Sequence, residues 1–409
     1  MAQRILHVIP AVAPRYGGPS VATFGMCRAL AAYDVETVVA TTDADGPDRL
    51  PVETGSIVRY GDVPVIFFPR AFSESFKWSG LLASWVHSHV SGFDLVHIHA
   101  VFSHSSVTTG RACRHAGVPY VVRPLGNLDP WSLARHGWRK QLLFKLGVRD
   151  LLRHAAGIHY TSEAERQLAQ GALPWLPQGI VVPLGVEDEL FVTAPPASSD
   201  ARYVLALCRL DVKKGIDLLI EAFHAQHARG VEHAWSLIIA GDGDPAYVAK
   251  LHRLAKAGAA RDRIAFRGWV TGAERHALIA GARAFALPSH QENFGLSVVE
   301  AMACGVPVIV TPGVNVSGEV AAHDAGWVVP RDRDAWTQTL AQVLADAAEL
   351  SRRGRLARAL AERFRWPSVG RQLVEVYAAL LESRVAVAPR RHAAPRPGWV
   401  PSADGRTDR

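Results

Sequence analysis

Two carboxylates eight positions apart form the most distinctive chemical pattern in this sequence. Glu292 and Glu300 flank the turn Asn293-Phe294-Gly295-Leu296, and a helix-like run follows that Gly305 and Pro307 end. The backbone N–H groups of Phe294, Gly295 and Leu296 would then point out of a helix start, where anions bind well. Carboxylates accept hydrogen bonds from paired hydroxyls. Glu292 and Glu300 can therefore hold a hexose and a ribose on either side of a pyrophosphate.

Two basic residues are spaced to serve the same ligand. Arg209 and Lys214 lie five positions apart in Cys208-Arg209-Leu210-Asp211-Val212-Lys213-Lys214-Gly215, between a predicted strand and a predicted helix. Two cations at one end of a sheet would neutralise a diphosphate leaving group. The alternative is a pair of solvated basic side chains. The neighbouring Lys213 competes for the inward position, and the spacing favours Lys214.

A glycine turn and a histidine pair occur earlier in the chain. Gly17 and Gly18 join the first predicted strand to a helix, and glycine permits close approach of the backbone to a ligand. His97 and His99 end the predicted strand Leu95–His99, where alternation places both on one face. A simple loop and structural histidines are the alternative interpretations.

The elements that must position these residues come in two alternating series of strands and helices, which indicates parallel sheets covered by helices on both faces. The first series predicts strands at Ile5–Ile9, Thr37–Thr41, Pro64–Phe68, Leu95–His99, Tyr120–Arg123, Gly157–Tyr160 and Ile180–Val182. The second predicts strands at Tyr203–Leu207, Ser236–Ala240, Ile264–Phe266, Ala284–Leu287 and Pro307–Thr311. The run Thr193–Asp200, rich in Pro, Ser and Ala, reads as a linker. Two doubly wound sheets joined in this way imply a ligand cleft between them.

The segment from Pro288 to Val308 resembles the Glu-x7-Glu signature of retaining glycosyltransferases of family 4, of the type that makes bacterial surface polysaccharides. The Arg-Leu-x-x-x-Lys-Gly order is similar to the phosphate-binding motif of that family, with Cys208 where Gly is usual. The resemblance covers roughly residues 4–382. It implies an α/β protein of the GT-B fold, with two Rossmann-like doubly wound domains facing across a cleft. The expected divisions are an acceptor domain (1–192), a linker (193–202), a nucleotide-sugar domain (203–366), a helix that crosses back (367–384) and a disordered tail (385–409).

The resemblance implies a hexosyltransferase that retains anomeric configuration and uses a nucleotide diphosphate sugar. Arg209 and Lys214 would hold the diphosphate, and Glu300 the ribose. Glu292, with the amides of Phe294 to Leu296, would hold the hexose. Gly17 and Gly18 would close over the donor phosphates, and His99 would lie near the reacting oxygen, so that the expected catalytic residues are His99 and Glu292.

The acceptor is expected to be a glycan or a lipid-linked molecule. Arg123–Trp131 resembles an acceptor-side segment of some family members, although Asp129-Pro130 is also a common helix start. Arg135–Arg153 is basic and partly amphipathic, which suits either an anionic membrane surface or an ordinary solvated helix. A cytoplasmic protein, with or without peripheral contact at the inner face of the membrane, is expected.

Bulk properties exclude several classes of protein. The chain has 409 residues, a formal charge of +7 and a pI of about 9.4, which suits a phosphate-bearing substrate and does not require nucleic acid. Its four cysteines lack metal-ligand spacing, and no apolar stretch reaches the length of a membrane span. Three Asp-x-Asp tripeptides arise easily by chance, so neither a metal nor another cofactor is expected. Alternatives are another GT-B enzyme, such as a nucleotide-sugar epimerase or a phosphorylase, and a non-catalytic scaffold subunit.

Overall fold

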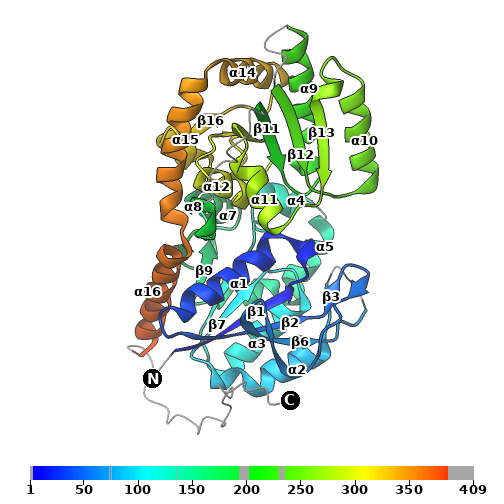
Figure 1. Ribbon diagram of the computed structural model, residues 1–409. Coiled ribbons are helices and arrows are strands. Elements are labelled where there is room, and N and C mark those ends of the chain that lie inside the picture. The colour runs from blue at the N-terminus through cyan, green and yellow to red at the C-terminus, as the bar shows by residue number, and fades with distance from the viewer. Residues whose placement is uncertain are drawn as a thin grey trace, which may run out of the picture.

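The computed structural model places two α/β lobes one above the other, joined along one side by long helices (Figure 1). It describes residues 3–72, 74, 76–135, 137–192, 202–229 and 235–385. The expected linker Thr193–Asp200 and all but the first residue of the expected disordered tail lie outside the described residues.

The N-terminal domain is built on an eight-stranded sheet in the order β10-β9-β8-β7-β1-β2-β6-β5. All pairs are parallel except β5 with β6 at one edge. Its strands are β1 (Arg4–Ala11), β2 (Glu36–Thr42), β5 (Ile57–Tyr60), β6 (Val63–Phe68), β7 (Leu95–His99), β8 (Tyr120–Arg123), β9 (Gly157–Tyr160) and β10 (Gly179–Val181), and β3 (Ala44–Asp45) and β4 (Asp48–Arg49) form a small hairpin beside it. Its helices are α1 (Gly18–Ala31), α2 (Gly80–His89), α3 (His104–Ala116), α4 (Pro130–Ala134), α5 (Gly137–Leu143), α6 (Arg149–Arg153), α7 (Glu163–Ala172) and α8 (Glu189–Val192).

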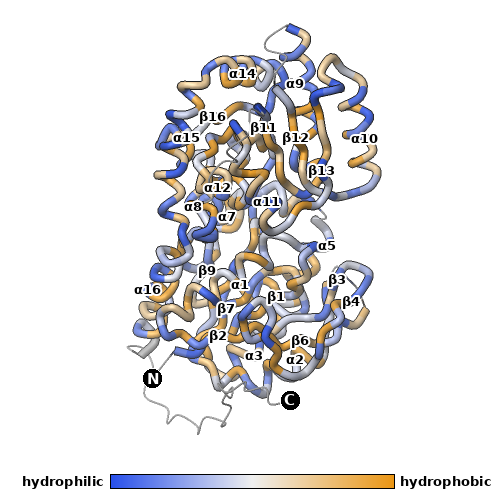
Figure 2. The backbone as a smooth tube through the Cα atoms, viewed as in Figure 1, coloured by the Kyte–Doolittle hydropathy of each residue, from blue (hydrophilic) through white to orange (hydrophobic). Residues whose placement is uncertain are grey.

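The C-terminal domain has a six-stranded parallel sheet in the order β13-β12-β11-β14-β15-β16. Its strands are β11 (Arg202–Leu207), β12 (Trp235–Ala240), β13 (Ile264–Gly268), β14 (Ala284–Leu287), β15 (Val308–Val310) and β16 (Gly326–Val328). Its helices are α9 (Ile216–Ala228), α10 (Pro245–Lys256), α11 (Gly272–Ala280), α12 (Leu296–Ala303), α13 (Ser317–Ala322), α14 (Arg333–Ala345), α15 (Ala347–Ala361) and α16 (Trp366–Val385). The strands are apolar and buried while the outer helix faces are polar (Figure 2), so each sheet is sandwiched between helical layers.

One apolar cluster runs from the C-terminal sheet into the N-terminal sheet. It contains Phe285 of the upper domain and Ile5 of the lower, and Trp366 and Tyr377 join them through α16. The Trp366 ring lies directly on two glycines, Gly25 of α1 and Gly185, where a Cβ atom at either would overlap it. Helix α16 therefore leaves the C-terminal domain and packs on α1 of the N-terminal domain.

The predicted strands are present with small shifts at their ends, and the two parallel sheets confirm the expected fold class. The antiparallel edge strand β5 and the terminal strand β16 were not predicted. The helix expected over Arg135–Arg153 is wrong as one continuous element. It divides into α5 and α6 around a wide turn, because Gly147 has φ 143° there and packs against Val107.

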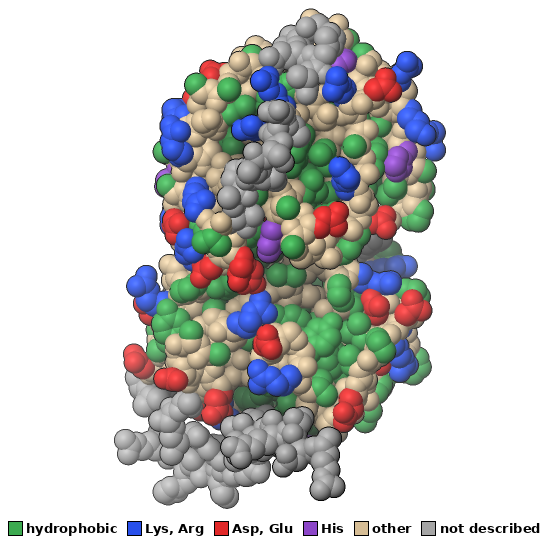
Figure 3. Space-filling model, in the orientation of Figure 1, with side chains coloured by type: hydrophobic (Ala, Val, Ile, Leu, Met, Phe, Trp, Pro, Cys, Tyr) green, Lys and Arg blue, Asp and Glu red, His purple; other side chains and the backbone are tan. Residues whose placement is uncertain are grey.

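The excess positive charge is dispersed on the face seen in Figure 3. Lysine and arginine side chains alternate there with aspartate and glutamate. Among the described residues, no helix is both long enough and apolar enough to cross a membrane.

Candidate functional site

Lys214 and Glu292 form an ion pair between two loops at the carboxyl ends of β11 and β14, and both side chains are largely buried. The short helical turn Val212–Lys214 ends at Gly215, whose φ is 66°. A Cβ at Gly215 would overlap the carbonyl oxygen of Pro288, so only glycine lets the two loops approach this closely. The fold therefore brings together a cation and a carboxylate that are 78 positions apart in the sequence.

The turn after Glu292 leads directly into helix α12, so the start of this helix lies close to the Lys214–Glu292 pair. Gly295 has φ 87° and precedes the first helical residue, Leu296. The backbone of Glu292 is fixed on both sides, because its N–H donates to Gly313 (2.8 Å) and its carbonyl accepts from Asn315 (3.1 Å). The free N–H groups of the first helical turn thus lie next to Glu292, at a position suited to an anion.

Glu300 lies in the second turn of α12 and is nearly buried. The guanidinium of Arg275, from the first turn of α11, contacts both of its carboxylate oxygens, with Nη1 donating to Oε1 at 2.8 Å and Nη2 contacting Oε2. No sequence pattern identifies this partner, because Arg275 is 25 residues away and belongs to a different helix.

Arg209 is exposed and, within the described residues, makes no hydrogen bond or ion pair, so its guanidinium is available to a ligand. Its backbone is held by the loop after β12. A Cβ at Gly241 would overlap the carbonyl of Cys208, and one at Gly243 would overlap that of Leu210. The Gly241-Asp242-Gly243 run thus serves close packing beside Arg209.

The loop of Gly17 and Gly18 is positioned by its neighbour Tyr16. The Tyr16 hydroxyl donates to Glu74 (2.6 Å) and accepts from the N–H of Gly46 (2.9 Å). Nζ of Lys77 lies 4.6 Å from the centre of the Tyr16 ring. Burial and the Glu74 carboxylate raise the pKa of Tyr16 to about 12, so the hydroxyl stays a donor.

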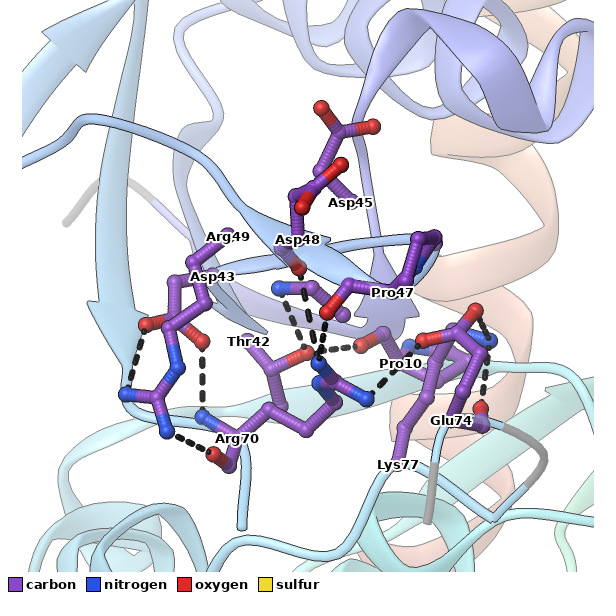
Figure 4. Close-up of polar contacts among 12 residues, drawn as sticks. Pro10, Thr42, Asp43, Asp45, Pro47, Asp48, Arg49, Arg70, Glu74 and Lys77 are labelled. Carbon is purple, nitrogen blue, oxygen red and sulfur yellow. Dashed lines mark hydrogen bonds and ion pairs between the residues drawn. The ribbon is translucent and has the colours of Figure 1, made fainter. Parts of the chain in front are cut away.

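Figure 4 shows a cluster of charged residues that connects the β3–β4 hairpin to the segment after β6. Arg70 donates to the carbonyl of Pro47 (3.1 Å) and pairs with Glu74 (3.5 Å), and its N–H donates to Asp43 (2.7 Å). Arg49 pairs with the other oxygen of Asp43 (3.5 Å). The segment after β6 and the β3–β4 hairpin are therefore fixed beside the glycine loop.

His99 is fully buried, in a layer of histidines between the N-terminal sheet and its covering helices. His97 and His99 lie on one face as predicted, with ring centres 4.3 Å apart, and Nε2 of His99 is 2.9 Å from Nδ1 of His7. Each of His7, His97 and His99 offers a nitrogen within 4.8 Å of the others, which is a possible metal-ligand arrangement. Four of their six ring nitrogens form hydrogen bonds within the layer or to Tyr377, whereas Nε2 of His7 and Nδ1 of His99 are buried without a partner among the described residues. The buried Arg123 adds positive charge beside them, which disfavours a divalent cation at this place.

A chain of hydrogen bonds connects this layer to α16. The Tyr377 hydroxyl is 2.7 Å from Nδ1 of His97, whose Nε2 is 3.2 Å from Nδ1 of His159. Nε2 of His159 is 2.8 Å from the carbonyl of Val182, which can only accept. Nε2 of His159 must therefore carry a proton, which leaves Nδ1 of the neutral ring to accept from the Nε2–H of His97. Nδ1 of His97 in turn accepts from the Tyr377 hydroxyl.

Stability is expected to fall as the pH drops below about 6.5. Burial, aided by Arg123, lowers the pKa values of His7 and His159 to about 3, whereas an unfolded histidine titrates near 6.5. Between pH 6.5 and pH 3 these histidines are protonated in the unfolded chain but neutral in the folded chain. The stability that is present above pH 6.5 is therefore lost as the pH falls toward 3. One such histidine contributes about 2 kcal/mol between pH 7 and pH 5.

Urea unfolding at pH 7 and pH 5 should show that this loss of stability is reduced in His7→Gln. It should be unchanged in His323→Gln, which replaces an exposed histidine and serves as the control. Equal losses in the wild type and both variants would contradict the prediction.

The segment Arg123–Trp131 of the N-terminal domain contacts loops of the C-terminal domain. Leu125 and Gly126 both have positive φ, and a Cβ at Gly126 would lie 2.8 Å from the Asn293 side chain. The N–H of Gly126 donates to Glu165 (3.0 Å), and Nζ of Lys213 lies 4.9 Å from the centre of the Trp131 ring. The two adjacent lysines thus divide their roles, with Lys214 at Glu292 and Lys213 on the other domain, as the spacing favoured.

Aspartates of Asp129-Pro130 and of the three Asp-x-Asp tripeptides have structural partners. The tripeptides are Asp43–Asp45, Asp242–Asp244 and Asp332–Asp334. Asp129 caps α4 by accepting from the N–H of Ser132 (2.8 Å), which confirms the helix-start interpretation. Asp244 caps α10 and Asp332 caps α14, while Asp45 pairs with Arg15. Ser162 caps α7 by accepting from the N–H of Glu165 (3.1 Å), and the Glu165 carboxylate accepts from the N–H of Thr161 (2.8 Å).

Two family models match the chain, one in each domain. Residues 17–185 match the glycosyl transferase 4-like domain, and residues 189–360 match the glycosyl transferases of group 1. A D-inositol 3-phosphate glycosyltransferase of Xylanimonas cellulosilytica is 26% identical over 399 residues, covering 90% of this chain and 93% of that protein. A GDP-mannose:cellobiosyl-diphosphopolyprenol alpha-mannosyltransferase of Komagataeibacter xylinus is 25% identical over 391 residues, covering 92% and 93%.

Solved structures share the whole architecture. HepE of Anabaena in complex with UDP-glucose superposes with a TM-score of 0.73 at 21% identity, covering 92% of this chain and 99% of that one. A sucrose-phosphate synthase of Thermosynechococcus elongatus gives 0.75 at 21% identity, covering 93% and 100%. At these identities the likeness supports the fold.

Proposed function

Because the chain is a GT-B glycosyltransferase of group 1, which transfers a sugar from a nucleotide sugar, we propose that it is a retaining hexosyltransferase of cell-surface polysaccharide synthesis. The acceptor would be a glycan or a lipid-linked sugar, like the polyprenol-linked one in the name of the Komagataeibacter relative. The observation that carries the proposal is the Lys214–Glu292 pair beside the start of α12.

In the proposed site, different residues of the C-terminal domain bind the diphosphate, the ribose and the hexose of the donor. Lys214 and the exposed Arg209 neutralise the diphosphate, and Glu300 accepts from the ribose. Glu292, with the amides of Phe294 to Leu296, binds the hexose. The ion pair holds Lys214 and Glu292 ready in the free protein. On binding, phosphate oxygens replace the carboxylate at Lys214 and sugar hydroxyls replace the ammonium at Glu292.

The proposed reaction takes place on one face of the sugar. The bond from the anomeric carbon to the diphosphate breaks, and the acceptor oxygen bonds to that carbon from the same side. The departing phosphate oxygen takes the acceptor proton, so no carboxylate nucleophile is needed. Gly17 and Gly18 border the phosphates, and domain closure excludes water. His99 would reach the reacting oxygen only after such a movement, because it is fully buried in the structure. Charge on the leaving group is carried by Arg209 and Lys214, so the proposed reaction uses no metal.

The donor test is a thermal-shift panel of UDP- and GDP-sugars with the purified protein. A nucleotide sugar that binds at 100 times its Kd should stabilise the folded state by about 2.7 kcal/mol. The shift should be lost in Lys214→Ala, and the stabilising sugar should be released slowly without an acceptor. An epimerase would convert the nucleotide sugar instead of releasing free sugar. The absence of any shift would favour a scaffold subunit.

Contact with an anionic membrane is proposed for the surface around α5. Trp138, Leu142 and Leu146 are exposed there, with Trp138 at 69%. Five basic side chains on the same stretch are exposed, whereas Lys140 is half-buried and donates to the carbonyl of Ser132. The exposed ones are Arg135, Arg139, Lys145, Arg149 and Arg153. Exposed aromatic and basic residues together suit the interface of an anionic bilayer, which would place the protein at the inner face of the cell membrane.

Vesicle flotation should detect this contact. The protein is expected to float with anionic vesicles and not with neutral ones, and Trp138→Glu with Leu142→Glu should reduce flotation at least several-fold. Leu168→Glu, the same change at an exposed leucine of α7, should have no effect. Equal recovery with both kinds of vesicle would contradict membrane contact.

A further inference from the structure

A groove of about 360 Å³ lies between helices α2 and α3, which pack side by side on one face of the N-terminal sheet (Figure 1). Its volume is in the range of sites for small ligands. The side chains that line it are Ala83, His87, Thr108, Arg111, Ala112 and His115. Because none of these residues belongs to the loops of the proposed donor site, the groove is a separate candidate site.

The two helices carry positive charge without any carboxylate. Asp94 is the only acidic residue between Glu74 and Asp129, and it precedes β7, so neither helix contains an acidic side chain. Arg111 donates to a backbone carbonyl and, among the described residues, forms no ion pair. Burial and the positive charge of Arg111 together lower the pKa of His104, at the start of α3. The charge in the groove is therefore not neutralised by the protein, which suits an anionic ligand.

Two histidines complete the polar lining, one from each helix. The rings of His87 and His115 have their centres 5.5 Å apart and their planes inclined by 28°. Both side chains are exposed, and their ring nitrogens have no hydrogen-bond partner within the part of the chain that the structure describes. Each lies in the last turn of its helix, where positive charge is favoured. An anion in the groove can therefore accept hydrogen bonds from two imidazolium rings and from the planar fork of Arg111.

Arg111 also connects the groove to the exposed surface around α5. Its Nη2 donates to the carbonyl of Leu146 (2.8 Å), and the Leu146 side chain is 57% exposed. Leu146 belongs to the same apolar surface as Trp138 and Leu142, for which contact with an anionic membrane is proposed above. A ligand that occupies the groove and continues onto this surface needs an anionic head and an apolar chain, which is the chemistry of an anionic lipid.

We propose that the α2–α3 groove binds the phosphate monoester headgroup of an anionic lipid through Arg111, His87 and His115. The inference rests on the proposed membrane contact and adds the chemistry of the lipid. A phosphate monoester carries a charge of about −1.5 to −2 at pH 7 and presents three acceptor oxygens. A phosphate diester carries a single negative charge and has only two free oxygens. Three donor groups in one groove therefore favour the monoester.

Flotation with two kinds of phosphatidylcholine vesicle tests this selection. One kind contains phosphatidic acid, a phosphate monoester, and the other contains phosphatidylserine, a diester, at matched surface potential. The wild type should bind the phosphatidic acid vesicles at least several-fold more tightly. Arg111→Gln should lower this affinity by about 10-fold, the effect of losing hydrogen bonds to a charged group, and should abolish the preference.

Arg114→Gln provides a matched control. It removes the same charge from the same helix, but Arg114 pairs with Asp150 (3.7 Å) and does not line the groove. It should weaken binding to both kinds of vesicle equally, because it changes only the general attraction to the surface. The double variant His87→Gln/His115→Gln leaves the contact of Arg111 with Leu146 in place and should also reduce the preference. If this double variant or Arg111→Gln folds and keeps the full preference, the assignment of the groove is wrong.

Glycerol 3-phosphate separates the lipid from a soluble source of the same chemistry. It should displace the wild type from phosphatidic acid vesicles, because it presents the same headgroup. If it binds in solution but the wild type shows no preference for phosphatidic acid, the ligand is a soluble phosphate monoester and the lipid assignment is overturned. Equal flotation with both anionic lipids and no binding of glycerol 3-phosphate would overturn the inference while leaving the membrane contact intact. Absence of flotation with either lipid would instead overturn the proposed membrane contact.

Discussion

Replacing Lys214 with alanine is expected to lower the rate of donor hydrolysis by about 100- to 1,000-fold, the cost of removing one preorganised charge that stabilises a leaving group. The loss should fall mainly on kcat, because charge on the diphosphate grows as its bond to the sugar breaks. The measurement is release of free sugar from the nucleotide sugar that the thermal-shift panel identifies, so it does not depend on knowing the acceptor.

The adjacent lysine provides a matched control. Lys213 has the same charge and lies one residue away, but its ammonium contacts Trp131 of the N-terminal domain. Lys213→Ala should therefore change hydrolysis by less than about 10-fold. Comparable losses in the two variants would show that the ion pair with Glu292 does not identify the phosphate ligand.

Replacing Trp366 with alanine is expected to cost about 3–5 kcal/mol of stability, the range for removing a buried Trp or Phe side chain. Trp366 is only 7% exposed and packs on Gly25 and Gly185, where the C-terminal helix crosses to the N-terminal domain. Thermal and urea unfolding would measure the change. Trp138→Ala, which removes an equally large but exposed ring, should stay within about 0.5 kcal/mol of the wild type.

A double-mutant cycle identifies the cause of this loss. Gly25→Ala alone should destabilise the protein, because the added Cβ would overlap the Trp366 ring. In the Trp366→Ala background the same change should cost much less, since the ring is gone. Additive effects would mean that the two residues do not depend on each other.

The sequence by itself determined the architecture and the residue types of the site. Runs such as Leu95–His99 and Tyr120–Arg123 are short, largely apolar and rich in β-branched residues, which suits buried parallel strands. The position of Gly295 before a helical run likewise fixed where α12 begins. These features depend on neighbours in the chain, which is why they could be predicted. The edge strand β5, by contrast, is only partly buried, and its pattern is too weak to identify.

The tertiary structure alone decided which side chains meet. Glu292 pairs with Lys214, Glu300 pairs with Arg275, and Tyr16 donates to Glu74. These partners are 78, 25 and 58 residues apart in the sequence. Such pairings depend on the strand order of each sheet and on loops that approach closely only where glycine removes a side chain. The different contacts of Lys214 and Lys213 also depend partly on the sequence and partly on the tertiary structure. Spacing could favour one lysine, but the turn that ends at Gly215 is what directs Lys214 to the carboxylate and leaves Lys213 against the other domain.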